Sequence, residues 1–182
     1  MDQVFAPWRI EWVKREDKNP DVEECVFCEL PERDDARENL VVAESERAFA
    51  LLNNAPYNPG HLMIIPRAHG GDYAVLDDAT LLDHARLKQR AFDALDDAFE
   101  PHAYNAGLNI GGGAAGGSID DHLHTHVVPR FEGDTNFMPI VSDTKVVVEG
   151  LAETYDALHE AFAAQPDARV PDADAAVVLD FD

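Results

Sequence analysis

The part of the chain that decides its fold is Gly116-Gly-Ser-Ile-Asp-Asp-His-Leu-His-Thr-His-Val-Val-Pro-Arg130. In a β-strand, side chains two residues apart point to the same face. The alternation therefore predicts a strand with His122, His124 and His126 on one face and Leu123, Thr125 and Val127 on the other. A single histidine in such a place is most often structural, but three imidazoles in a row are costly to bury without a role. The pattern favours a functional site on this strand.

The loop before the strand is rich in glycine, from Gly111 to Gly117, and is followed by Ser118. Glycine lets backbone N–H groups approach an anion closely, and the Ser118 hydroxyl adds a donor. Taken alone, such a loop is as often a flexible turn. Directly before the histidines, it predicts a phosphate-binding loop beside candidate nucleophiles. Neutral imidazole can attack phosphorus, and an ordinary pKa of ~6.5 leaves histidine largely neutral at physiological pH.

Elements on both sides of this strand predict an α+β fold. Apolar runs predict strands over 40–43, 48–52, 61–65 (ended by Pro66) and 103–110, and helical spacing predicts helices from Asp77 to about Phe99 and from Thr144 to Ala164. Asp77 or Asp78 is a plausible helix N-cap. There is no internal repeat and no regular βαβ alternation, which favours α+β. We expect one domain over residues 1–164 and a mobile acidic tail over 165–182, within which 177–179 could pair locally.

The charge and cysteine content limit the partners and the compartment. The 182 residues include 14 Lys and Arg against 36 Asp and Glu, so the formal net charge is −22. Such a field repels phosphate backbones, so we expect no general binding of nucleic acid, and an anionic substrate would need local donors. No apolar run approaches the ~18 residues that cross a bilayer, so we expect no membrane partner. Two cysteines are too few for a secreted disulfide framework, and the expected location is the cytoplasm.

The acidic residues are spread over the whole chain, for example at Asp34-Asp35, Asp96-Asp97 and Asp120-Asp121. This distribution is typical of a surface adapted to high salt, and a halophilic source is our working hypothesis. The melting temperature should therefore fall when salt is lowered from molar to millimolar concentration, because the Debye length grows to ~30 Å at 0.01 M and the charges repel one another. Thermal unfolding followed by circular dichroism measures this. An unchanged melting temperature would contradict the hypothesis of a halophilic source.

Residues 116–130 resemble the signature of the histidine-triad (HIT) superfamily. Upstream, Asn53 and the segment from Asn58 to Pro66 resemble the nucleoside-side segment of that family. The continuation from Gly133 to Phe137, with Lys145-Val146, is most similar to the branch of diadenosine tetraphosphate (Ap4A) phosphorylases. The resemblance extends from about Cys25 to Phe162, and it is specific because several separated motifs occur in the same order.

The resemblance implies a role for each matching residue. His124 would be the nucleophile that takes the nucleotidyl group, and His126 would contact the phosphates and assist the leaving group. The carbonyl of His122 would hold His124 in the attacking tautomer. The implied substrate-binding residues are Asn53 on the ribose side and Asn109, Gly117 and Ser118 on the phosphate side. The family fold is a small α+β domain with an antiparallel sheet and two main helices, and its members usually form homodimers that extend the sheet.

The pair Cys25 and Cys28 leaves three interpretations open. A redox dithiol would require the pair at a helix N-terminus after a strand, a context that is not evident in the sequence. The two residues could also be free structural cysteines. Related zinc-bearing members of the family use Cys-x-x-Cys with two histidines, and this resemblance implies a structural Zn²⁺ site of Cys25, Cys28, His69 and His122. The remaining histidines His84, His102 and His159 are expected at the surface.

The resulting hypothesis is an enzyme that acts on dinucleoside polyphosphates through a nucleotidyl-histidine intermediate. The resemblance favours phosphorolysis of Ap4A to ATP and ADP, with inorganic phosphate as second substrate. One alternative is a hydrolase of nucleoside phosphoramidates or other nucleotide conjugates. Another, of a different class, is a nucleotide-binding regulatory module with little turnover. Arg130 or Lys145 could add positive charge for phosphate if the fold brings either of them near the histidines.

Overall fold

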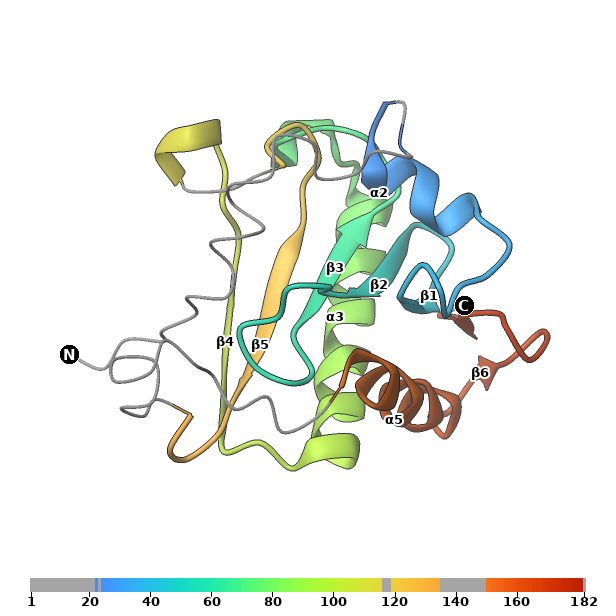
Figure 1. The fold of residues 1–182 in the computed structure, drawn as a ribbon. Coiled ribbons are helices and arrows are strands. Elements are labelled where there is room, and N and C mark those ends of the chain that lie inside the picture. Colours follow the sequence, from blue (N-terminus) through green and yellow to red (C-terminus); the bar gives the residue numbers. More distant parts are fainter. Residues whose placement is uncertain (1–21, 23, 116–118, 135–149, 182) are drawn as a thin grey trace.

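The computed structural model describes residues 22, 24–115, 119–134 and 150–181. Its centre is a seven-stranded sheet in the order β4-β5-β3-β2-β1-β7-β6 (Figure 1). The strands are β1 (Val41–Glu44), β2 (Ala48–Leu52), β3 (Leu62–Pro66), β4 (Ala103–Gly107), β5 (Thr125–Arg130), β6 (Ala168–Arg169) and β7 (Val177–Leu179). All neighbours are antiparallel except β1 and β7, which run parallel. The α+β class is confirmed, with one parallel pair added to the expected antiparallel sheet.

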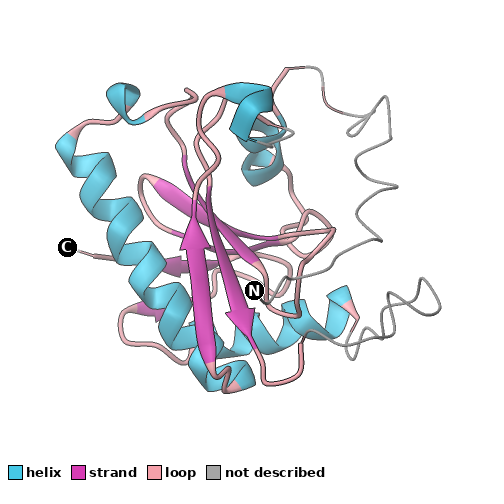
Figure 2. Ribbon diagram, turned by 90° about the vertical axis from the view of Figure 1, so that its left-hand side faces the viewer, coloured by secondary structure: helices cyan, strands magenta, loops and turns pink. Residues whose placement is uncertain are grey.

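Two long helices, α3 (Asp78–Phe99) and α5 (Leu151–Ala163), cover one face of the sheet (Figure 2). Helix α3 begins as predicted, because the Asp77 side chain accepts a hydrogen bond of 2.7 Å from the backbone N–H of Thr80. It ends at Glu100, which adopts the left-handed conformation with φ of 45°. Together with the inner strands, the helices bury a continuous apolar core, and this core supports the sheet from behind the histidines.

The opposite face of the sheet is covered by the short helix α2 (Val26–Glu29) and the 3₁₀ turn η1 (Leu30–Glu32). Phe27 of α2 is buried against side chains of the central strands, among them Phe49, Met63 and Ile65. Two further 3₁₀ turns, η2 (Tyr73–Val75) and η3 (Gly112–Ala115), lie in loops. Because Cys25 is the N-cap of α2 and Cys28 lies within it, this packing brings both cysteines to the face on which the histidines lie.

Strand β5 begins at Thr125, three residues later than predicted. The ladder between β3 and β5 has Ile64 opposite Thr125 as its last pair on this side. The backbone N–H of Leu123 instead donates to the carbonyl of Gly70, at 2.7 Å. The predicted alternation is kept across this boundary: Thr125 contacts His84 of α3 on one side of the sheet, whereas His122 and His124 contact Phe27 of α2 on the other. His122 and His124 therefore leave the ladder while keeping the face that the sequence pattern predicts.

The end of the chain differs from the expected mobile tail. Strands β6 and β7 extend the sheet, and Val177 and Leu179 are buried in the main core. The Pro and Asp residues that suggested a tail lie in the turns around these short strands, whereas the apolar run Val177–Leu179 forms β7. The predicted last helix is present from Leu151, and its expected first residues, 144–149, lie outside the described residues.

Candidate active site and metal-ligand cluster

His124 is buried, with 6% of its surface exposed, and its tautomer follows from a hydrogen bond to the backbone. Its Nδ1 lies 2.9 Å from the carbonyl oxygen of His122. A carbonyl only accepts, so Nδ1 carries the proton and Nε2 keeps its lone pair. Burial lowers the pKa of His124, although the hydrogen bond to His122 opposes this shift. The ring is thus neutral near pH 7, with Nε2 as the nucleophilic atom.

Phe27 provides part of the apolar surroundings of His124. Its ring centroid lies 5.1 Å from that of His124 and 5.6 Å from that of His122. Phe27 stands between the two cysteines in α2, so the segment that carries the cysteines also covers the nucleophile. The sequence analysis did not predict this contact, because nothing local to Cys25-Val-Phe-Cys28 indicates which strand the phenylalanine meets.

His126 is connected to a histidine that the sequence analysis did not assign to the site. His61 is fully buried, its Nε2 lies 3.0 Å from Nδ1 of His126, and its Nδ1 accepts from the backbone N–H of Tyr57 at 3.2 Å. Neutral His61 therefore carries its proton on Nε2 and donates it to His126. This leaves the proton of a neutral His126 on its own Nε2. The Tyr57 ring stacks on His61 with centroids 5.0 Å apart.

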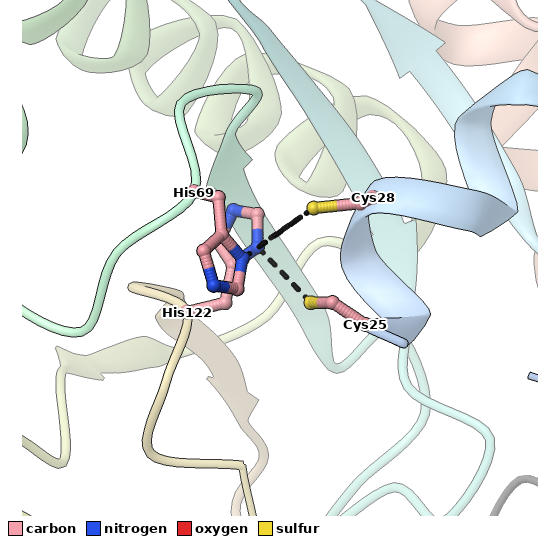
Figure 3. A group of neighbouring side chains, drawn as sticks. All are labelled: Cys25, Cys28, His69 and His122. Atoms are coloured by element: carbon pink, nitrogen blue, oxygen red, sulfur yellow. Dashed lines mark hydrogen bonds between the residues drawn. The ribbon is translucent and has the colours of Figure 1, made fainter. Parts of the chain in front are cut away.

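His122 belongs both to the histidine row and to a cluster with Cys25, Cys28 and His69 (Figure 3). Its Nε2–H donates to the carbonyl of Pro66 at 2.8 Å, which leaves Nδ1 unprotonated. Nδ1 lies 3.3 Å from Sγ of Cys25 and 3.7 Å from Sγ of Cys28. The four ligand atoms all lie within 4.8 Å of one another.

This cluster fits a tetrahedral ion of the size of Zn²⁺. Zn–S bonds of ~2.3 Å and Zn–N bonds of ~2.0–2.1 Å place S and N ligands about 3.6 Å apart in a tetrahedron. The three S···N distances between the cysteines and the histidines are 3.3, 3.5 and 3.7 Å. Two thiolates and two imidazoles are also the donor set typical of structural zinc. The residues present therefore could hold the ion that the sequence implied.

Cys25 is the N-cap of α2, but the pKa of Cys28 argues against the redox interpretation of the pair. Burial, together with the neighbouring Cys25, raises the pKa of Cys28 to about 11 in the metal-free chain. Reactive thiols have a lowered pKa instead, because the thiolate is the nucleophile. Metal binding here must release protons, so the affinity should increase with pH.

The predicted substrate-binding residues are placed only in part. Asn53 is buried, and its side chain accepts from the N–H of Ala55 and donates to the sulfur of Met63, the residue opposite His126 in the sheet. Asn109 is partly buried and follows β4, whose Gly107 pairs with His126. Gly117 and Ser118 lie outside the described residues. The phosphate loop therefore stays a prediction.

Arg130 does not provide the positive charge suggested for phosphate. Its guanidinium makes two hydrogen bonds to Asp134, at 2.6 and 3.0 Å, and a third to Asn105. This pairing neutralises the charge and holds the pKa of Asp134 below its usual range. Asp134 also accepts a hydrogen bond from the Asn58 side chain. Arg130, Asp134 and Asn58 thus form a hydrogen-bonded group at the C-terminal end of β5. Lys145, the other suggested cation, lies outside the described residues.

One expectation about the remaining histidines is wrong. His84 was predicted at the surface of α3, but it is 3% exposed and points to the sheet. Its Nε2 lies 3.2 Å from both the carbonyl of Ile64 and Oγ1 of Thr125. Burial lowers its pKa, so the ring is neutral. The signal was present in the helix, because His84 lies three residues before Leu87 and seven before Ala91 and therefore shares the buried face of α3.

The comparison with known proteins agrees with this geometry. A sequence model of the HIT domain matches residues 35–133. The chain belongs to the HIT family. It is 38% identical over 174 residues to an AP-4-A phosphorylase of Mycobacterium tuberculosis, with 91% of this chain and 87% of the relative covered. It is 29% identical to the adenosine 5'-monophosphoramidase hnt1 of Schizosaccharomyces pombe, with 58% and 74% covered.

A solved structure with the same fold has a bound metal. It is a Zn-bound histidine triad family protein from Mycobacterium smegmatis, 25% identical, with a TM-score of 0.59 that covers 77% of this chain and 94% of the other. The family and the phosphorylase relative identify this HIT protein as an enzyme of the nucleotidyltransferase or hydrolase type. Within the described residues, no helix is long and apolar enough to cross a membrane.

Proposed function

We propose that this HIT protein catalyses phosphorolysis of dinucleoside polyphosphates, with Ap4A as substrate and ATP and ADP as products. The observation that carries the proposal is the buried, neutral His124, whose Nδ1–H is held by the carbonyl of His122. The AP-4-A phosphorylase relative supports the choice of substrate, because the similarity covers 91% of this chain.

In the first step, Nε2 of His124 attacks the α-phosphorus of one adenosine. An N–P bond forms, the bridging P–O bond breaks, and ATP leaves with that oxygen. His126, whose proton is held on Nε2 by the contact with His61, donates to the phosphate oxygens on which charge develops. In these tautomers, Nε2 of His124 has a lone pair and Nε2 of His126 has a proton, and the centroids of the two rings are 5.0 Å apart. Substrate needs only to be held in line with His124.

In the second step, an oxygen of inorganic phosphate attacks the same phosphorus. The new P–O bond forms as the N–P bond breaks, so ADP leaves and His124 returns to its neutral form. Asn53 on the ribose side and Asn109, Gly117 and Ser118 on the phosphate side are the proposed substrate-binding residues. Backbone N–H groups of a glycine loop suit this use, because they bind an anion without adding charge.

We propose that Cys25, Cys28, His69 and His122 hold a structural Zn²⁺. When bound, the ion would cross-link α2 to the start of the histidine strand. The chain's own contribution is then positional: His122 Nδ1 is a ligand, while its carbonyl orients His124. The metal-binding segment and the nucleophile are thus linked through one residue.

The product profile with and without phosphate tests the proposed function. Given Ap4A and phosphate, the wild-type protein should form equal amounts of ATP and ADP. Without phosphate, the rate should fall by at least about tenfold, because the nucleotidyl group has no preferred acceptor. Separation of the nucleotides by ion-exchange chromatography measures both rates. ATP and AMP formed at the same rate under both conditions would identify a hydrolase instead.

A second candidate function is hydrolysis of nucleoside phosphoramidates, which the similarity to the fission-yeast monophosphoramidase favours. It uses the same attack by His124, so only the leaving group and the acceptor differ. Adenosine 5'-phosphoramidate as sole substrate separates the two: faster turnover than with Ap4A and phosphate would favour the hydrolase. If the protein turns over neither compound, the result would favour a nucleotide-binding regulatory module.

We also propose a homodimer that extends the sheet at β4. Among the described residues, β4 has a neighbouring strand only on its β5 side, and four of its five residues are exposed. The other side of such an edge strand can offer backbone groups to another chain. Light scattering coupled to size exclusion would measure the mass of the particle in solution. A particle of the 20.0 kDa of one chain would contradict the dimer.

A further inference from the structure

His84 occupies a position with a specific relation to the nucleophile. It reaches from α3 to the sheet, where Nε2 is 3.2 Å from the carbonyl oxygen of Ile64 and 3.2 Å from Oγ1 of Thr125. The carbonyl only accepts, so Nε2 carries the proton and donates it. One N–H thus contacts two neighbouring strands, β3 and β5, at the same point.

That point is the end of the ladder between the two strands. Ile64 and Thr125 form its last pair, and His124 directly precedes Thr125, the first residue of β5. Beyond it, the chain is held by the bond from Leu123 to Gly70 instead. Contacts on both sides thus hold the backbone near His124: the Leu123 N–H on one side, and on the other Thr125, through its ladder pair with Ile64 and its side-chain contact with His84.

We propose that His84 is a positioning residue for the nucleophile: by fastening Thr125 to Ile64, it sets the place where His124 leaves the ladder. Thr125 lies between His124 and His126, so a shift of its backbone moves both rings. This inference rests on the proposed function. It differs from a purely structural role, in which His84 would only fill space behind the sheet and its loss would affect stability alone.

The test compares variants of the metal-loaded protein with Ap4A and phosphate. His84→Leu keeps the volume but removes the N–H, and kcat should fall by about tenfold or more while KM stays within about twofold, because sub-ångström misplacement acts on the chemical step. His84→Gln places an amide N–H near the position of Nε2 and should restore kcat to within about threefold of wild type. Thr125→Val removes only the hydroxyl, and a smaller fall in kcat is expected.

Leu87→Val is the matched control. Leu87 is fully buried one turn along α3 and contributes only apolar packing. It should lower the melting temperature and leave kcat unchanged at a temperature well below melting. An unchanged kcat in His84→Leu and Thr125→Val, or an equal loss in Leu87→Val, would overturn the proposal.

A spectroscopic measurement separates this inference from the proposed function. A ¹H–¹⁵N spectrum of the imidazole groups reports the Nδ1–H of His124, assigned by its absence in His124→Ala. The signal should shift or broaden in His84→Leu and stay in place in Leu87→Val, whatever the substrate is. Wild-type protein without turnover would defeat the proposed function alone, whereas an unmoved His124 signal in His84→Leu would defeat the positioning role.

Discussion

Replacing His124 with alanine is expected to lower kcat for nucleotidyl transfer by about 10⁴-fold or more, as removal of a nucleophile does in other covalent mechanisms. The lone pair of Nε2 makes the N–P bond, and neither His122 nor His126 can replace it. His122 Nδ1 faces the cysteines, and His126 Nδ1 accepts from His61. Single-turnover kinetics with Ap4A measure the loss.

Nucleotide affinity should stay within about threefold of wild type, because the nucleophile acts only after binding. Titration with a non-cleavable Ap4A analogue provides this value. His102→Ala is the matched control: His102 is exposed, and its side chain accepts a hydrogen bond from the backbone N–H of Glu132. The His102→Ala variant should have the same kcat as the wild type. More than about 1% of wild-type activity in His124→Ala would mean that another group is the nucleophile.

Removal of one cysteine from the metal-ligand cluster is expected to have the second largest effect. Purified protein should contain about one zinc ion per chain, and Cys25→Ser should abolish this content. The melting temperature should fall by roughly 10 °C or more, because metal binding contributes folding free energy and each kcal/mol corresponds to about 2–4 °C in a chain of this size. Elemental analysis and differential scanning calorimetry provide the two values.

Wild-type protein treated with a chelator is the control for the substitution itself. It should melt at about the temperature of Cys25→Ser, since both lack the link between α2 and His122. Protein prepared without chelators that contains no metal would refute the site. So would a Cys25→Ser variant that melts with the wild type, since the cysteines would then be ordinary buried thiols.

Much of the fold could be predicted from local patterns. The N-cap at Asp77 and the strand that ends at Pro66 both depend on chemistry within a few residues, and the structure has them where the sequence indicates. The end of the chain could not be predicted in this way. Val177 pairs with Ala43 of β1, which lies more than a hundred residues earlier, and Val177 and Leu179 are buried in the main core; composition alone does not show such contacts.

The candidate site, too, could be predicted from the sequence only in part. A strict period of two was sufficient to group the three histidines, and family resemblance was needed to add His69 to the cysteines. His61, Phe27 and His84 were missed because each meets the histidine strand only through the register and packing of the sheet. The one signal for His61 was its position directly before a fully apolar strand, where a buried imidazole requires a partner.

The central claim is a nucleotidylated His124 that is passed to phosphate, and rapid quenching tests it most directly. Protein mixed with Ap4A in the absence of phosphate and quenched at alkaline pH should carry one adenylyl group on the peptide that contains His124. Addition of phosphate before the quench should remove the group and release it as ADP. An adenylyl group on another residue, or ADP formed without any adenylylated protein, would contradict the account.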